Sequence, residues 1–469
     1  PGSLSPAVRV PNAGTITVHG YKDTQRNMNQ CLEHLKSALD KHPELKYSLN
    51  LSLWQTDFLR FYQSQTNYNI SKEMQHLKAT IYKGKKSCSF EVNHPDVTKV
   101  DSALVEAMQI IDALPEDPDF VDLEDDLRLR APREVVNNIE AIDLKHKTGI
   151  LSMLAKNAAE HDFELYGTFI CNYSSTRIVN SNGLDKSSTH SPIYLEVKAV
   201  HRSSQVTVLE TFGGDDFRYF DYEAFNDRLM AKIANTKNPV VDVEPGEYEV
   251  ILAPRCVAEF VSYLSYAMNA HSLDQHSSYF EDKAGQKVFP DHISIIDDPH
   301  DPEMIRQDYG SGGHLYETMA LIDKGVFKGF MCDQYYHFKL GLPKNGNTAS
   351  CLKIAPGHST LEGMMANVKR GLYISSLHYM NLINAKETSL TGLTRDGTFL
   401  IEDGKITAVV NNLRFTEKIS RILENTLELE DKAYTIPFSE NYADFDVSTV
   451  KAPHARISKF NITSSTKTI

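Results

Sequence analysis

Histidine and carboxylate pairs are the residues most capable of chemistry in this chain, because both groups ligate metals and carry protons. His271 and His276 lie five residues apart, which places them about 140° from each other around a helix. That spacing is poor for one metal ion and favours a polar surface. His314 and Glu317 could hold a metal only with ligands from other elements, and a solvated helix is the simpler interpretation. The glycine-rich residues 310–313 follow no strand–helix unit and predict a flexible turn.

The composition excludes several classes of protein. The 469 residues include 62 Asp and Glu against 49 Lys and Arg, which gives a net charge of -13. An acidic chain with no basic run lacks the electrostatic footprint of a general nucleic-acid binder. No apolar stretch approaches the ~18 residues that a membrane-spanning helix needs. There is also no Walker loop and no G-x-S-x-G elbow, so neither a nucleotide-binding loop nor a serine-hydrolase motif is present.

The cysteines indicate a reducing compartment. The chain has six of them, scattered and without a C-x-x-C pair. This pattern is typical of buried or free thiols rather than of a disulfide framework. The first residues show no charged start followed by an apolar core, so no signal peptide is visible. We therefore expect a cytoplasmic protein.

Hydrophobic periodicity predicts an α+β arrangement for the first half of the chain. Residues 24–41 carry apolar side chains at helical spacing, whereas residues 48–92 alternate as antiparallel strands do. Residues 114–126 combine two prolines with an acidic run, which predicts a solvated linker. Further helices are expected over residues 147–160 and 222–234.

The second half predicts short antiparallel strands with a few helices. A helix is expected near residues 257–268 and another near 417–427. Between two apolar runs, Asp403-Gly404 is a strong hairpin signal.

The turn-rich residues 235–239 mark a plausible boundary between these two parts. We therefore predict an α+β fold with two domains. Residues 1–235 would form an N-terminal α/β-type domain with a mixed or antiparallel sheet and helices. Residues 236–469 would form a C-terminal, mainly antiparallel β domain with a few helices.

Several short segments, taken together and in order, resemble the TldD/PmbA family. This family, also called modulators of DNA gyrase, is described as a metallopeptidase family. The resemblance covers about residues 50–460, and no single motif decides it. The segments that carry it are Leu114-Pro-Glu-Asp-Pro118, Ile178-Val-Asn-Ser-Asn-Gly-Leu184, Pro245-Gly-Glu-Tyr-Glu-Val-Ile-Leu-Ala-Pro254, Asp282-Lys-Ala-Gly-Gln-Lys-Val-Phe-Pro290, Val368-Lys-Arg-Gly-Leu-Tyr373, Phe399-Leu-Ile-Glu-Asp-Gly-Lys-Ile406 and Val410-Asn-Asn-Leu-Arg-Phe415.

The resemblance implies a two-domain fold and a cytoplasmic dimer that encloses a cavity. In the family, the TldD subunit carries zinc on the helix after the strand that residues 248–252 resemble. Its signature is His-Glu-x-x-x-His, with a distant C-terminal cysteine as the third ligand. Three protein ligands leave one zinc position for a water molecule that the metal acidifies, while the glutamate serves as general base. TldD and its partner TldE (PmbA) trim peptide leaders and degrade unfolded chains.

This chain departs from the family at that signature. Ser262 stands in place of the first histidine, Tyr263 in place of the glutamate and Ala267 in place of the second histidine. No cysteine follows Cys351, so the third ligand is missing too. Serine, tyrosine and alanine cannot form a high-affinity zinc site. The chain is therefore most similar to the PmbA/TldE branch, without a catalytic residue, a metal ligand or a cofactor of its own.

Two functions remain open at this stage. In the first, the chain is the PmbA/TldE-like subunit of a TldD-type peptidase and holds an extended peptide or unfolded protein, with Ser262, Tyr263 and Tyr266 as candidates for lining the groove. The two tyrosines could equally pack the domain core. In the second, the chain is a divergent homodimeric hydrolase that uses histidines such as His314 or His358. A non-catalytic scaffold is a further alternative. The expected partner is a second copy or a TldD-like catalytic subunit, with no nucleic acid and no membrane.

Overall fold

The computed structural model describes residues 21–440 and 445–465 as a mixed α+β protein built from three β-sheets and flanking helices. The α-helices are α1 Tyr21–Leu39, α2 Val97–Ile111, α3 Asn138–Ala141, α4 Leu144–Ala159, α5 Tyr222–Asn235, α6 Pro254–Ser265, α7 Ala270–Asp274, α8 Gln334–Leu340, α9 Leu361–Ala366 and α10 Ile419–Glu424. Short 3₁₀ helices are η1 Phe217–Tyr219, η2 Tyr266–Met268 and η3 Ser311–Gly313. Within the described ranges, none of the helices is both long and apolar enough to cross a membrane.

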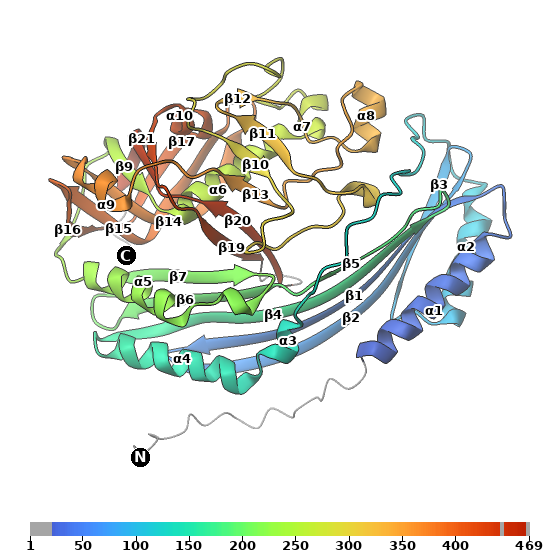
Figure 1. Ribbon diagram of the computed structural model, residues 1–469, viewed down its shortest axis with the longest axis horizontal. Helices are drawn as coiled ribbons and strands as arrows, with labels where there is room; N and C mark the ends of the chain where they lie inside the picture. The colour runs from blue at the N-terminus through green and yellow to red at the C-terminus, as the bar shows by residue number, and fades with distance from the viewer. Residues whose placement is uncertain (1–20, 441–444, 466–469) are drawn as a thin grey trace.

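A long, curved antiparallel sheet occupies the N-terminal half (Figure 1). Its strand order is β3-β2-β1-β4-β6-β7, with β5 paired to β4. Alternate residues of β1 are buried, as expected for a strand with one face on a core. That face packs on α1 and α2 at one end, while α4 and α5 pack on the sheet at the other end. The strands are β1 Lys46–Tyr62, β2 Gln65–Lys83, β3 Lys86–Asn93, β4 Phe163–Asn180, β5 Asp185–His190, β6 Ile193–His201 and β7 Thr207–Gly214.

The second sheet closes on itself. Strand pairing runs β14-β9-β21-β17-β15, and β15 pairs again with β14. Strands β16 and β8 extend β15, and β18 pairs with β21. A ring of pairings leaves fewer free edges than an open sheet. The strands are β8 Val240–Val241, β9 Gly246–Leu252, β14 Arg370–Asn384, β15 Ser389–Glu402, β16 Lys405–Val410, β17 Leu413–Lys418, β18 Thr426–Leu429 and β21 Ala455–Ser465.

A third sheet lies beside α6, which packs against its strands β13, β19 and β20. The order is β12-β11-β10-β13-β20-β19. Its last strand, β19, contacts β7 of the N-terminal sheet, so the two halves of the chain meet there (Figure 1). The strands are β10 Ile295–Asp297, β11 Met319–Asp323, β12 Val326–Phe327, β13 Leu352–Ile354, β19 Tyr434–Glu440 and β20 Asp446–Ala452.

The α+β fold class and the mainly antiparallel pairing predicted from the sequence are confirmed. The division into two domains at residue 235 stays a prediction. One hydrophobic cluster contains residues from both halves, with Phe225 and Leu229 of α5 beside Phe399 of β15 and Val409 of β16. The two halves therefore share apolar packing as well as a chain connection.

Candidate functional site

The helix expected to carry the family's zinc signature is α6. It follows β9 directly, with Ala253 as N-cap residue and Pro254 in its first turn. Proline suits this position because its fixed φ matches the helix and it lacks only an N–H that would be unpaired anyway. Strand β9 pairs in parallel with β14, and the backbone N–H of Ala253 donates to the carbonyl of Ile374. The start of α6 is therefore anchored to β14.

A single face of α6 is not buried. Its members recur at spacings of three and four residues, so they form one stripe along the helix. The remaining face, which includes Val257, Phe260 and Leu264, packs into the large C-terminal core. We refer to the exposed side as the α6 stripe, which consists of Arg255, Glu259, Ser262, Tyr263 and Tyr266 in the first residue after the helix.

The side chains at the signature positions do not suit zinc, because two of them donate hydrogen bonds to backbone carbonyls and the third has no ligating atom. The Ser262 hydroxyl donates to the carbonyl of Ala258 at 2.9 Å, and the Tyr263 hydroxyl donates to the carbonyl of Met380 at 2.9 Å. Ala267 has no ligating atom and is buried in the core. Over residues 21–440 and 445–465, no group of three or more His, Cys, Asp or Glu side chains could hold a metal ion. The donor set at α6 therefore does not fit zinc.

The two tyrosines of the stripe differ in exposure. Tyr263 is half-buried and packs against the C-terminal core, and its burial raises the pKa of its hydroxyl. Tyr266 is 62% exposed, and its ring stands edge-on to Tyr263 at 6.2 Å between centroids. Tyr263 thus has the packing role that sequence reasoning left open, whereas Tyr266 is available to a ligand. Their role in a groove stays a prediction.

An ion pair on the stripe was not anticipated from the sequence. Arg255 Nε lies 3.5 Å from Glu259 Oε1, and the two side chains are 18% and 15% exposed. Burial raises the pKa of Glu259 to about 7, although Arg255 opposes that shift. The only signal in the sequence was an Arg–Glu pair at i,i+4 within an otherwise apolar helix.

Arg255 links the stripe to the rest of the molecule. Its guanidinium lies over the ring of Phe438 at 5.0 Å from the centroid and donates to the carbonyl of Pro437 at 3.3 Å. Tyr194 and Glu196 of β6 add to the electrostatic environment of Arg255. The stripe therefore begins where the N-terminal sheet and the third sheet meet.

Strand β14 offers a partly unpaired edge near the stripe. Residues 371–374 pair with β9 on one side and β15 on the other. In the described chain, the rest of the strand after Ile374 pairs with β15 alone. Tyr379, Leu382 and Ile383 on this part are exposed. Because Tyr263 bonds to Met380, the unpaired edge runs beside the α6 stripe.

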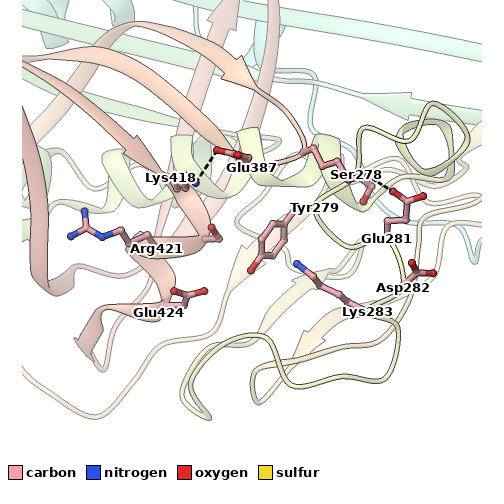
Figure 2. A pocket seen from close by; sticks show the side chains of 11 residues that line it. Ser278, Tyr279, Glu281, Asp282, Lys283, Glu387, Lys418, Arg421 and Glu424 are labelled. Atoms are coloured by element: carbon pink, nitrogen blue, oxygen red, sulfur yellow. Dashed lines mark hydrogen bonds and ion pairs between the residues drawn. The ribbon is translucent and has the colours of Figure 1, made fainter.

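A separate open pocket of about 540 Å³ lies on the surface near α10 (Figure 2). None of its lining residues belongs to α6. Its charges are largely matched, with Lys386 paired to Glu281 and Lys418 paired to Glu387, each at 2.8 Å. Lys283 Nζ lies 3.3 Å from the centroid of the Tyr279 ring. Figure 2 shows the Lys283 side chain pointing toward that ring. These matched charges favour a solvated surface over a catalytic centre.

The histidine pairs behave differently from one another. His271 and His276 are exposed, as expected, and α7 ends at Asp274 so they share no helix. The interpretation of His314 and Glu317 as a solvated helix is wrong. The segment is a 3₁₀ turn followed by loop, and His314 is only 8% exposed. His358 is exposed.

Residues 114–126 form a loop, as predicted, and residues 115–119 are exposed, but the prediction of a solvated segment is wrong at Glu124 and Asp126. Glu124 is buried, and its Oε1 lies 2.8 Å from Lys344 Nζ and 3.4 Å from His314 Nδ1. Burial alone would raise the pKa of Glu124, but the neighbouring His314 and Lys344 lower it to about 2. Asp122 and Asp126 pair with Lys46 and Arg128 of the N-terminal half, whereas Glu124 pairs with Lys344 of the C-terminal half. His314 Nδ1 therefore faces two carboxylates, Glu124 and Asp126, each at 3.4 Å.

Comparisons with known proteins agree with this architecture. Residues 245–464 match the model of the PmbA/TldA metallopeptidase C-terminal domain. The structure of TldE from Thermococcus kodakarensis superposes with a TM-score of 0.80 at 20% identity, covering 92% of this chain and 100% of that chain. That likeness shows the fold.

Curated relatives match over shorter spans. A zinc metalloprotease TldD homolog from Saccharolobus solfataricus is 24% identical over 57% of this chain and 64% of its own length. A metalloprotease PmbA homolog from Haemophilus influenzae is 22% identical over 54% of this chain and 61% of its own length. A metalloprotease from Methanothermobacter thermautotrophicus matches over 42% of its length, so the chain spans less than two thirds of these relatives. The matching C-terminal domain model and the shared fold make this chain similar to the proteins of the TldD/PmbA family.

Proposed function

We propose that this chain is the PmbA/TldE-like subunit of a TldD-type peptidase complex. It forms part of the cavity and holds an extended peptide, without a zinc site of its own. The observation that carries the proposal is that none of the three residues at the signature positions can bind zinc. The hydroxyls of Ser262 and Tyr263 donate to backbone carbonyls, and the side chain of Ala267 is a buried methyl group. The likeness to a TldE fold supports the same branch.

The holding role is supported by what lies next to the helix. The part of β14 after Ile374 has one partner strand among the described residues, and an extended peptide can add to such an edge through main-chain hydrogen bonds. Those bonds do not depend on the peptide sequence, which suits a subunit that accepts unfolded chains. Tyr266, 62% exposed, would add a contact of an aromatic ring with the peptide.

The test combines purified chain with a TldD-type subunit that carries His-Glu-x-x-x-His. We expect the chain alone to bind a fluorescent unstructured peptide without cleaving it, and to contain zinc well below one atom per molecule. Cleavage should require both subunits and stop with a chelator. Tyr266→Ala should weaken peptide binding by about five- to tenfold, whereas Tyr219→Ala, an exposed tyrosine outside the stripe, should leave it unchanged. Chelator-sensitive cleavage by the chain alone would overturn the proposal.

Restoring part of the zinc signature should not restore activity. In Ser262→His with Tyr263→Glu, the position of Ala267 and the distant cysteine would still supply no ligand. We expect zinc content to stay well below one atom per chain, measured by elemental analysis, and no peptide cleavage. Because Tyr263 loses its bond to Met380, the variant should also be less stable by about 1 kcal/mol. Recovery of chelator-sensitive cleavage would show that the signature lies elsewhere.

A further inference from the structure

Basic side chains from both halves of the chain meet on the side of the N-terminal sheet where β5 and β7 end. Arg133 comes from the segment without helix or strand that precedes α3, and His190 is the last residue of β5. Arg306 comes from the loop between β10 and η3. We refer to these three residues as the arginine cluster. It shares no residue with the α6 stripe.

Hydrogen bonding in and around the arginine cluster leaves three donors and one acceptor, Asp308 Oδ1, unused. Arg133 Nη2 lies 3.2 Å from His190 Nδ1, and since a guanidinium can only donate, Nδ1 is the acceptor and Nε2 carries the ring proton. His190 Nε2, Arg133 Nε and Arg306 Nε are all buried, and none has a partner among the described residues. Buried donors without a partner are rare in native proteins, and an unseen ion or water is a usual explanation.

The charges around the cluster are also unbalanced. The carboxylates that face it are Asp215, 3.5 Å from Arg133, and Asp308, also 3.5 Å from Arg133. Arg130 approaches Asp308 at 4.0 Å, so three guanidinium groups share two carboxylates. Asp216, the next acid in the chain, is paired with Arg218 at 2.7 Å.

The two arginines of the cluster repel each other. Burial lowers the pKa of Arg306, and the neighbouring charge of Arg133 lowers it further. Asp215 also accepts the backbone N–H groups of Ser191 at 3.2 Å and Arg306 at 3.4 Å, which divides its charge among several donors. Two half-buried guanidinium groups whose Nε donors are buried and unpaired suit recognition of an oxyanion.

We propose that Arg133, His190 and Arg306 bind a small oxyanion of the phosphate or carboxylate class. Three N–H donors require several acceptor lone pairs, which an oxyanion supplies, whereas one water molecule accepts only two hydrogen bonds. Because the donor atoms are buried, the ligand is a free ion of phosphate or acetate size rather than a macromolecule. With Arg133 and His190 from the N-terminal half and Arg306 from the C-terminal half, the anion would join the two halves. The inference does not depend on the proposed function.

The test is calorimetric titration of the full chain with sodium phosphate and, separately, sodium acetate at constant ionic strength. We expect saturable binding of at least one anion, at one per chain, and a rise in the thermal unfolding temperature. Arg306→Gln should weaken that binding by about tenfold or more. Arg202→Gln, which removes an exposed arginine paired with Asp162 and Glu164, should change nothing. Equal binding by Arg306→Gln, or no saturable binding by the native chain, would overturn the inference.

A measurement on the native protein keeps the test independent of folding in the variants. Crystals soaked in sodium selenate should show an anomalous peak within hydrogen-bonding distance of Arg133 Nε, His190 Nε2 and Arg306 Nε. A water molecule at that place, with selenate found only at other arginines, would overturn the inference. Preference for phosphate over acetate in the titration would identify the tetrahedral dianion as the natural class, and the reverse order a carboxylate.

Discussion

Lys147→Ala is expected to lower the free energy of unfolding by about 3–5 kcal/mol. Lys147 lies on α4 with its side chain fully buried, and its Nζ lies 2.5 Å from Asp57 Oδ2 on β1. Its ammonium also lies 5.4 Å from the centre of the Phe169 ring. Removing the lysine leaves Asp57, which is 15% exposed, as an almost buried carboxylate without its counter-charge. The large cost comes from that unpaired charge rather than from the loss of contact area.

Urea unfolding followed by circular dichroism would measure the effect of Lys147→Ala. Lys156→Ala is the matched control, since Lys156 lies on the same helix and is exposed, so its loss should stay within about 0.5 kcal/mol. Replacing both partners, as in Lys147→Met with Asp57→Leu, should recover most of the stability because no charge is then left unpaired. A loss below about 1 kcal/mol in Lys147→Ala would mean that Asp57 is well solvated without its partner.

Local sequence signals predicted the regular elements well where the chain itself supplies the cause. Asp403-Gly404 forms the predicted hairpin between β15 and β16, with φ of 45° and 80°, as a two-residue turn with left-handed conformations requires. The predicted helix over residues 147–160 is α4, whose N-cap Asp143 accepts from the N–H of His146. The helix expected over residues 417–427 is shorter, since α10 ends at Glu424 and Thr426 begins β18. There, pairing with β21 overrides helical periodicity.

The errors share one cause, which is partners distant in the chain. The sequence predicted a solvated loop here because only Arg128, which pairs with Asp126, lies near these acidic residues in the chain. In the fold, Glu124 meets Lys344, which lies 220 residues later. The exposed, helical interpretation of His314 failed for the same reason, since its neighbours Glu124 and Asp126 come from the other half. A run of charged residues in the sequence predicts solvent exposure reliably only when their ion-pair partners lie nearby in the chain.

The sequence predicted the helix that carries the candidate groove residues, but not the charged pair that lies beside them. Ser262 and Tyr263 lie on the face of α6 that is not buried, and Tyr266 continues that face as the first residue after the helix. Arg255 and Glu259 share that face, but an Arg–Glu pair at i,i+4 also occurs on many solvated helices. Their low exposure depends on β19 and β6 lying over the start of α6. That arrangement is a tertiary property that no local pattern contains.

Glu259 should make the stability of the chain depend on pH. In the folded protein burial raises its pKa to about 7, whereas the unfolded value is 4.5. Between these values the folded state holds the proton and the unfolded state releases it. The folded state therefore binds more protons, so stability falls as pH rises through this window. From pH 5 to pH 8 the loss should amount to about 2–3 kcal/mol.

Glu259→Gln should remove this dependence. The difference in unfolding free energy between Glu259→Gln and the native chain should therefore shift in favour of the variant by about 2–3 kcal/mol from pH 5 to pH 8. The variant also leaves Arg255 without its carboxylate, but that cost is nearly constant with pH and cancels in the comparison. Denaturant titrations at several pH values measure the shift, with Glu223→Gln, an exposed residue of α5, as control.

Parallel stability profiles for the native chain and Glu259→Gln would mean that solvent or Arg255 keeps the Glu259 carboxylate ionised at neutral pH. The profile also bears on the proposed peptide groove, because Glu259 lies one helical turn before Tyr263 on the α6 stripe. A carboxyl group of the α6 stripe that titrates near neutrality would change the charge near a peptide held in the proposed groove within the physiological range. Peptide affinity of the native chain should then vary between pH 6 and pH 8, and that variation should disappear in Glu259→Gln.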